Sequence, residues 1–276
     1  MPELPEVELV AASLQKLVSG RTISSAELRR ERLAPDHAAE SFRELLAGAT
    51  IRVITRRGKH ILFDLDNGRT LITHLRMSGR FMLLGPDRED PKYSHAVFYF
   101  GDESRLVFQD QRHFGFMRIV ESPNLHDAKE LKKLAPEPFG PEFTAAYLRR
   151  TLKSANRALK LVLLDQTKIL GLGNIYASEA MFMAKANPKR RASSLTLKKI
   201  DALFETIRGV LAESIAHGST LNVDPENIDG SYYGGGYESS WRVYDREGEP
   251  CIGCSARIKR VVQGGRSTFY CPVCQR

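Results

Sequence analysis

All four cysteines of this 276-residue chain fall within its last 26 residues, as two C-x2-C pairs separated by sixteen residues. Two such pairs on adjacent turns allow four thiolates to surround one Zn2+ tetrahedrally, at a spacing typical of structural zinc sites. Four protein ligands leave no coordination position for a substrate, so the sequence predicts one structural Zn2+ held by Cys251, Cys254, Cys271 and Cys274. Two disulfides are disfavoured by a reducing cytosol, and a redox C-x-x-C lacks its βαβ context.

The first eight residues, MPELPEVE, could carry nucleophilic chemistry. Because Pro2 is small, we expect Met1 to be removed, which leaves a secondary amine with a pKa of roughly 8 that is partly neutral at cellular pH. Attack of this amine on a sugar C1′ would give a cationic iminium, and Glu3 could give and take protons beside it. The same octapeptide also suits a plain helix start, with early prolines and acids in the first turn, and taken alone it favours that interpretation.

Three further segments could contact a phosphate or a base. GLGN (171–174) precedes a predicted helix at Ile175, where exposed amides and a capping Asn174 could bind a phosphate oxygen, although a plain glycine turn explains the segment equally well. A dinucleotide fingerprint is disfavoured because Tyr176 stands at the third glycine position. HLRMSG (74–79) and QRHFG (111–115) place an Arg beside apolar residues on predicted loops, as in proteins that unstack bases; taken singly, such apolar residues more often belong to a core.

The charge balance points to a polyanionic partner. The chain has 41 Lys and Arg against 33 Asp and Glu, a net charge of +8, which favours nucleic acid first and an acidic membrane surface second. Residues 241–276 hold seven of the basic and three of the acidic residues, a net +4, so the cysteine-rich tail is predicted to be a platform for phosphates. A solvated basic surface or a protein-binding ribbon is the alternative for this tail.

Hydrophobic patterning describes the elements that must position these residues. With 42% hydrophobic and 27% charged residues the chain has a globular composition, so wholesale disorder and a fibrous rod are excluded. No apolar run reaches the roughly 18 residues of a spanning helix, and acidic residues occupy the positions where a secretory signal would be positive, so we expect a cytosolic protein.

An amphipathic helix is predicted over Leu4–Val18, followed by β-rich runs that predict an antiparallel sandwich or barrel. These runs are Ile51–Thr55, Ile61–Leu65, Thr70–His74, Ala96–Phe100 and Arg105–Gln109. A proline-rich stretch over 122–141 is predicted to link two domains, and a Gly- and Tyr-rich stretch over 218–236 to be a mobile loop. Between them, helical spacing predicts Phe143–Leu152, Leu159–Asp165, Ile175–Ala184 and Leu197–His217.

Five motifs in one order closely resemble the bacterial formamidopyrimidine-DNA glycosylase family: Pro2–Glu8, HLRMSG, QRHFG, GLGNIYASE (171–179) and the closing TFYCPVCQR (268–276). The resemblance spans nearly the whole chain. It implies an α+β protein with an N-terminal β-sandwich flanked by helices (1–121), a linker (122–141), a helix-two-turn-helix domain with a lesion-capping loop (142–240) and a zinc finger (241–276).

The resemblance also implies roles for single residues. Pro2 resembles the Schiff-base nucleophile, Glu3 the adjacent acid, Glu6 a pocket residue and Lys59 a lysine that reaches the damaged nucleotide and its phosphate. The implied phosphate clamps are Lys160, Asn174 and Arg266. The residues implied to fill the position of the vacated base are Met77, Arg112 and Phe114. His113, where the family usually has another basic residue, and the 218–237 loop depart from the family pattern.

The implied activity is that of a bifunctional DNA glycosylase and lyase. Such an enzyme excises oxidised purines, 8-oxoguanine and formamidopyrimidines, from duplex DNA and cleaves the strand by β,δ-elimination. The resemblance further implies a monomer in the bacterial cytoplasm, acting on nucleoid DNA without a membrane partner. An endonuclease VIII type acting on oxidised pyrimidines is an alternative that Leu4 in PELPE disfavours. A non-catalytic zinc-ribbon DNA-binding protein is another, and it leaves Pro2 and Glu3 without a role.

Overall fold

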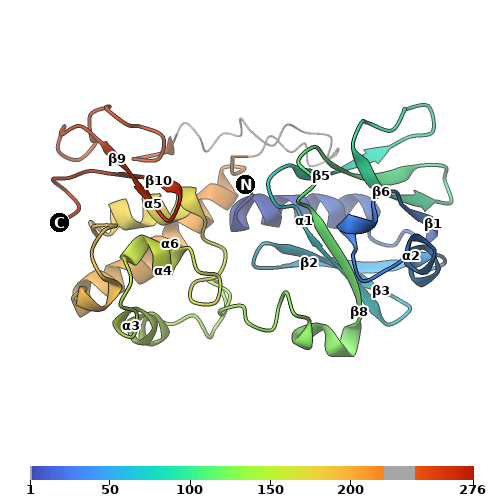
Figure 1. Ribbon diagram of the computed structural model, residues 1–276, viewed down its shortest axis with the longest axis horizontal. Coiled ribbons are helices and arrows are strands. Elements are labelled where there is room, and N and C mark those ends of the chain that lie inside the picture. Colours follow the sequence, from blue (N-terminus) through green and yellow to red (C-terminus); the bar gives the residue numbers. More distant parts are fainter. Residues whose placement is uncertain (1, 221–239) are drawn as a thin grey trace. The chain divides into compact units, whose positions relative to one another are not determined.

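The computed structural model describes residues 2–220 and 240–276, which belong to two compact units (Figure 1). The described part of the first unit is 2–132 with 218–220, and that of the second is 133–217 with 240–276. The division between Lys132 and Lys133 falls inside the predicted linker, and the second unit contains both the helices and the cysteine-rich tail. Apart from 218–220, the predicted mobile loop lies outside the described residues.

The first unit opens with α1, Leu4–Val18, whose bounds are those predicted from the apolar spacing. Val7, Val10 and Leu14 on one face of this helix are buried in the core of the unit. Glu3 is the N-cap, in extended conformation, and forms a capping box with Glu6: each side chain accepts a hydrogen bond from the other residue's backbone N–H. The helix-start interpretation of the octapeptide is therefore correct as a description of its structure.

Two four-stranded antiparallel sheets form the predicted sandwich. Their orders are β1-β6-β7-β5 and β2-β3-β4-β8. The strands are β1 (Ile23–Leu28), β2 (Ile51–Arg57), β3 (His60–Leu65), β4 (Arg69–His74), β5 (Gly79–Leu84), β6 (Ser94–Phe100), β7 (Arg105–Asp110) and β8 (Phe116–Glu121). The sequence patterns missed β1, β5 and β8, and also helix α2 (Ala39–Leu46) and the short 3-10 helix η1 (Glu31–Leu33). A second short 3-10 helix, η2 (Ser122–Asp127), lies inside the proline-rich stretch.

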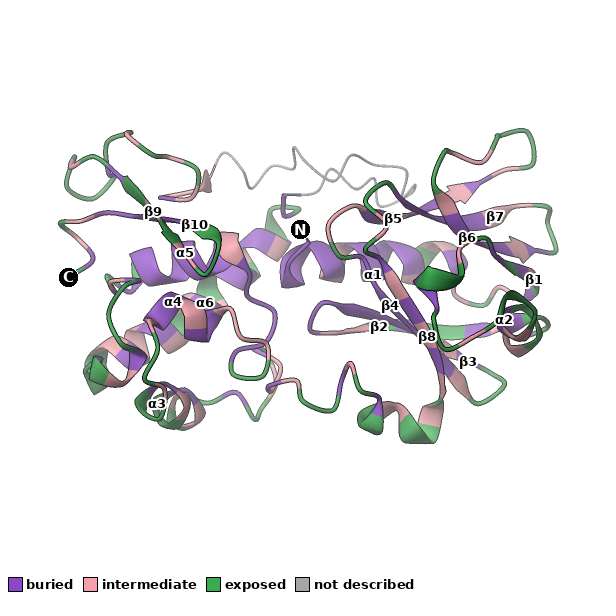
Figure 2. Ribbon diagram, viewed as in Figure 1, coloured by how far each residue is buried: buried purple, intermediate pink, exposed green. Residues whose placement is uncertain are grey.

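Aromatic side chains join the two sheets. Phe63 of β3 meets Phe81 of β5 with ring centroids 5.5 Å apart, and Phe81 meets Phe108 of β7 at 5.1 Å. Both pairs have the edge-to-face geometry that aromatic rings prefer, and all three residues are buried. Much of the strand ribbon of this unit has the colour of buried residues in Figure 2. The core therefore lies between the sheets, and it reaches β7 directly before the QRHFG segment.

The second unit is helical up to its cysteine-rich tail. Its helices are α3 (Ala145–Lys153), α4 (Leu159–Leu163), α5 (Asn174–Met183) and α6 (Leu197–Ala216), with a 3-10 turn, η3, over Ala192–Ser194. All four α-helices were predicted, and each predicted end lies within about two residues of the observed one. Thr144 and Thr196 are the N-caps of α3 and α6, where threonine is a favoured residue, and each side-chain oxygen accepts a backbone N–H of the first turn. Tyr176 of α5 and Ser214 of α6 share a buried hydrogen bond of 2.6 Å.

The tail forms a hairpin of β9 (Lys259–Gln263) and β10 (Arg266–Tyr270). Gly264 and Gly265 make the two-residue turn with φ of 57° and 73°, a conformation that favours glycine at both positions. A Cβ on Gly264 would also lie 2.8 Å from Cδ2 of Leu161 in α4. In the ranges 2–220 and 240–276, no helix is long and apolar enough to cross a membrane.

Candidate active site and metal centre

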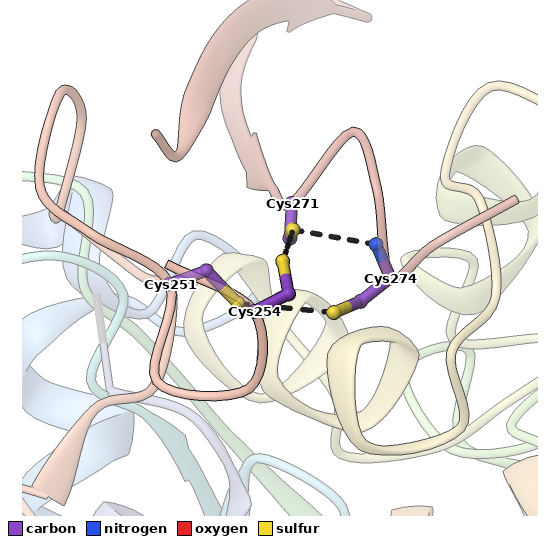
Figure 3. Close-up of side chains that lie close together, drawn as sticks. All are labelled: Cys251, Cys254, Cys271 and Cys274. Atoms are coloured by element: carbon purple, nitrogen blue, oxygen red, sulfur yellow. Dashed lines mark hydrogen bonds between the residues drawn. The ribbon is translucent and has the colours of Figure 1, made fainter. Parts of the chain in front are cut away.

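The four predicted zinc ligands converge in the tail (Figure 3). Their Sγ atoms all lie within 4.8 Å of one another; the Cys254–Cys271 distance is 3.4 Å and the Cys251–Cys274 distance 3.9 Å. Tetrahedral zinc with Zn–S bonds of about 2.3 Å requires S···S distances near 3.8 Å, whereas a disulfide requires about 2.05 Å. The donor set therefore fits a closed structural Zn2+ site, and the disulfide alternative is wrong for these residues.

Backbone N–H groups support this interpretation. The amide of Gly253 donates to Cys251 Sγ at 3.4 Å, and that of Cys274 donates to Cys271 Sγ at 3.3 Å. Amide donors stabilise thiolates, which are the form that binds zinc. Among the described residues, this cluster is the one group of His, Cys, Asp or Glu side chains arranged to hold a metal ion.

The residues predicted for catalysis in the first unit lie at the start of α1. Pro2 and Glu3 are buried, with Glu3 2% exposed. The carboxylate of Glu6 accepts the backbone N–H of Glu3 at 2.8 Å through Oε2 and the hydroxyl of Thr220 at 3.0 Å through Oε1. Glu6 thus fastens the Glu3 segment and the chain at Thr220 to one carboxylate, next to the positive end of the helix dipole.

Lys59 lies in the tight turn between β2 and β3, where Gly58 has φ 59°. The turn is tied to α1 because Arg56 at the end of β2 pairs with Glu8 at 2.7 Å and also donates to the Gly58 carbonyl at 3.1 Å. Lys59 itself is buried. The fold therefore brings the predicted lysine and the predicted nucleophile to elements that are directly joined.

Two buried histidines continue this chain of contacts. His60 follows Lys59 and pairs in the sheet with His74, and their rings meet edge to face with centroids 4.7 Å apart. Burial lowers the pKa of His60 to about 4 and the pKa of His74 well below its usual range, so both rings are neutral near pH 7. His74 Nδ1 accepts the N–H of Arg76 at 2.9 Å, which leaves the ring proton on Nε2.

We call residues 74–79 and 111–115 the paired loops, because Asp110 joins them. This fully buried carboxylate accepts the Ser78 hydroxyl, the Arg112 N–H at 3.1 Å and the Gly115 N–H at 2.6 Å. The Ser78 oxygen also accepts the Arg112 N–H, at 3.0 Å. One carboxylate and one hydroxyl thus hold the loop of Met77 against the loop of Arg112.

Two glycines allow the paired loops to lie this close. A Cβ on Gly79 would lie 2.5 Å from the Leu75 carbonyl oxygen and 2.7 Å from the Phe108 ring. A Cβ on Gly115 would lie 2.8 Å from the same ring and 3.1 Å from the Asp110 carboxylate. Both glycines of the two motifs are therefore required by the approach of the loops to the core.

The tips of the paired loops are exposed. Phe114 is 55% exposed, and the Arg112 guanidinium lies over its ring, 5.4 Å from the centroid. Met77 is half-buried. The core interpretation of these two apolar residues is wrong, because a core residue would be buried; their contact with DNA stays a prediction.

The GLGN segment departs from the expectation in one detail. Asn174 is the first residue of α5 and not its cap; Gly173 is the N-cap, in extended conformation. The turn before it is fixed by Gln166, which accepts the Gly171 N–H at 3.0 Å and donates to the Leu172 carbonyl at 2.9 Å. Within the described residues, the side-chain oxygen of Asn174 is buried and has no hydrogen-bond partner.

Lys160 and Arg266 are brought together by the hairpin. Lys160 on α4 is fully buried, and its Nζ donates to the Ser267 carbonyl at 2.5 Å and to the Thr268 hydroxyl at 2.8 Å. Lys160 thus anchors β10, at whose start Arg266 is exposed. β10 packs against α5, so Arg266 and Asn174 belong to adjoining elements of the same unit.

Sequence reasoning missed three buried residues that position this machinery: Asp110, Glu179 and His95. Glu179, inside the GLGNIYASE motif, is fully buried and accepts the backbone N–H groups of residues 242, 243 and 244, each at 2.9 Å. The signal was an acidic residue among apolar neighbours on a predicted helix. His95 carried no such signal, because its hydrogen-bond partners, Asp110 and His113, lie on other elements.

Comparisons with known proteins agree along the whole chain. Three family models match: the formamidopyrimidine-DNA glycosylase N-terminal domain over residues 1–117, the H2TH domain of the same proteins over 134–224, and the zinc finger found in FPG and IleRS over 248–276. Proteins named formamidopyrimidine-DNA glycosylase from Listeria innocua and a Bradyrhizobium species are 40% and 42% identical, and the matches cover 100% of each chain.

Solved structures show the same fold. A mutant of Lactococcus lactis FPG, in complex with a Fapy-dG containing DNA, superimposes with a TM-score of 0.92 at 33% identity over 100% of both chains. Lactococcus lactis Fpg with an abasic site containing DNA gives 0.92 at 32% identity over 99% of both chains. This chain therefore belongs to the formamidopyrimidine-DNA glycosylase family.

Proposed function

We propose that this protein is a bifunctional DNA glycosylase and abasic-site lyase that removes oxidised purines, 8-oxoguanine and formamidopyrimidines, from double-stranded DNA. Its full-length similarity to the named glycosylases supports this proposal, as does the solved relative that holds Fapy-dG DNA. The observation that carries it is the start of α1, where Glu6 accepts the backbone N–H of Glu3, a buried residue that directly follows Pro2.

The first step is base excision. With Met1 removed, Pro2 has a secondary amine whose lone pair attacks C1′ of the damaged nucleotide, while the bond from C1′ to the base breaks and the base leaves with a proton. Opening of the sugar ring then transfers a proton to O4′ and leaves a C=N+ iminium between C1′ and Pro2. Glu3 is the group that gives and takes these protons, from a fixed position one residue away.

The second step is strand cleavage. The iminium withdraws electrons, so loss of a C2′ proton breaks the bond from C3′ to its phosphate oxygen, and a further elimination breaks the bond at C5′. We assign to Lys59 a contact with the damaged nucleotide and its phosphate, because its turn is tied to α1 through Arg56 and Glu8.

The base must leave the duplex before this chemistry begins. We call Met77, Arg112 and Phe114 the wedge residues and assign them to fill the position of the everted base. They lie on the paired loops, which the Asp110 carboxylate holds together. Asn174 and Arg266 bind phosphates, and Lys160 acts through β10, which it anchors from within the unit.

The four cysteines hold Zn2+ in a closed site, so the metal stabilises the finger and with it Arg266. We assign the bond-breaking steps to residues of the first unit. We place the protein in the bacterial cytoplasm as a monomer that acts on nucleoid DNA.

Borohydride trapping tests the nucleophile. Reduction during reaction with 8-oxoguanine DNA should yield a covalent complex, and peptide mapping should place the adduct on Pro2. Pro2→Gly should lose most strand cleavage and keep lesion binding, and Glu3→Gln should impair base excision. An adduct on Lys59, or full activity in a preparation that mass spectrometry shows to retain Met1, would contradict the mechanism.

A second candidate substrate class can be compared in the same assay, because Lactococcus lactis Fpg has also been solved with an oxidized pyrimidine containing DNA. On duplexes with one lesion opposite cytosine, we expect faster excision of 8-oxoguanine than of thymine glycol. The opposite ranking would assign the protein to the endonuclease VIII type.

A further inference from the structure

A pair of histidines lies beside the paired loops. His113 stands between the wedge residues Arg112 and Phe114, and its backbone is left-handed, with φ 59°. A non-glycine residue adopts this conformation at a cost, so the surrounding contacts must hold it. Its N–H donates to the Asp110 carbonyl at 3.3 Å, which closes a tight turn around Arg112.

His95 supplies the side-chain contact that holds His113. It lies on β6, is 6% exposed, and its Nε2 is 2.8 Å from His113 Nδ1 and 2.9 Å from the Asp110 carbonyl oxygen. The centroids of the two imidazole rings are 4.9 Å apart, and the Tyr93 ring meets the His113 ring edge to face with centroids 5.6 Å apart.

The geometry determines where the protons are. A carbonyl oxygen only accepts, so His95 Nε2 carries a hydrogen that it directs at Asp110 and at His113. His113 Nδ1 must then be an unprotonated acceptor. A proton on His113 Nδ1 would place two N–H groups face to face, whereas a proton on His95 Nδ1 would leave the contact intact.

The surroundings of His95 oppose a positive charge on its ring. Burial lowers the pKa of His95, and His113 and Arg30 lower it further, against the Asp110 carbonyl and carboxylate, which raise it. The Asp110 carboxylate is already occupied by Ser78 and the loop amides. Arg112 adds a second positive group, on the loop itself.

We propose that His95 is a positioning residue that fixes the wedge residues through the Nε2–H···Nδ1 bond to His113, so that loss of this bond loosens the loop and slows excision from duplex DNA. The inference rests on the proposed wedge function. It deepens that function by naming the side-chain contact that holds the wedge loop in place.

Two single-turnover rates separate the wedge from the chemistry. One is excision of 8-oxoguanine from duplex DNA; the other is cleavage of an abasic site in a single strand, which needs no base to be unstacked. The readout is the ratio of the excision rate to the single-strand cleavage rate, both measured at one pH.

Three substitutions test the bond. His95→Leu removes the donor and should lower the ratio roughly threefold to tenfold, the effect of one hydrogen bond. His95→Gln keeps an N–H near the same position and should restore the ratio. His113→Asn keeps a hydrogen-bond acceptor and tolerates the left-handed backbone, so it should keep the ratio close to that of the unaltered protein.

Controls distinguish the possible failures. His37→Leu removes a half-buried histidine of the same unit, whose Nε2 accepts the Ile119 N–H, and should leave the ratio unchanged. If alanine at all three wedge residues leaves the ratio unchanged, the wedge function and this inference both fail. If that variant lowers the ratio but His95→Leu leaves it unchanged, only the histidine inference is overturned.

Discussion

Glu179→Gln is the substitution whose cost the structure specifies most fully. The carboxylate is fully buried and accepts three backbone N–H groups at 2.9 Å: Arg242 through Oε2, and Val243 and Tyr244 through Oε1. Glutamine has the same shape. With its oxygen toward Val243 and Tyr244, its NH2 group faces the Arg242 N–H.

The magnitude follows from these contacts. One charge-assisted bond is lost and a buried N–H is left unpaired, while the other two bonds become neutral and weaker. The sum is a loss of about 3 to 5 kcal/mol from the unfolding free energy of the second unit. At about 2 to 4 °C per kcal/mol, Tm should fall by about 10 °C. Because residues 242–244 lead into the finger, zinc should also pass faster to a chromogenic chelator.

Asp201→Asn is the matched control. Asp201 receives two hydrogen bonds from Arg149, at 2.7 and 2.6 Å, but its side chain is 40% exposed. The same carboxylate-to-amide change should therefore affect the unfolding free energy far less. Thermal unfolding and zinc release would be measured on both variants. Equal losses, or a Glu179→Gln loss below about 1 kcal/mol, would refute the argument that burial sets the cost.

Further predictions concern the metal, the first unit and the loops. Cys251→Ser, or removal of zinc by chelation, should weaken DNA binding by disordering Arg266; full affinity in a demonstrably metal-free protein would reject this. In the folded protein His60 has a pKa of about 4, whereas in the unfolded chain it becomes protonated below about pH 6.5. Its contribution to the unfolding free energy is therefore complete above about pH 6.5 and falls by about 3 kcal/mol as the pH drops to about 4. Urea midpoints across this range should fall less steeply for His60→Phe. Gly115→Ala should slow excision from duplex DNA and spare cleavage of a single-strand abasic site, because the added Cβ would push the loop away from Phe108. Gly85→Ala, with open space around the added Cβ, is the control, and equal effects of the two substitutions would contradict the explanation.

Local patterns were enough for several features of this protein. The C-x2-C spacing identified the metal ligands, because two short turns bring paired thiolates together whatever the rest of the chain does. The apolar spacing gave the bounds of α1 and placed the ends of α3 and α6 to within about two residues. The family resemblance rested on contiguous motifs, and the comparisons confirmed it.

Other features depend on residues that are far apart in sequence. β1, β5 and β8 were missed because half-buried strands are stabilised by their neighbours across the sheet more than by their own propensity. The resemblance gave Lys160 as a phosphate clamp, and the structure buries it against β10, where its carbonyl and hydroxyl partners lie over a hundred residues later in the sequence. Asp110 and Glu179 acquire their roles only when two loops, or a helix and the finger, meet around a single carboxylate. Hydrogen-bond partners of a buried charge are set by packing, so tertiary structure alone decided them.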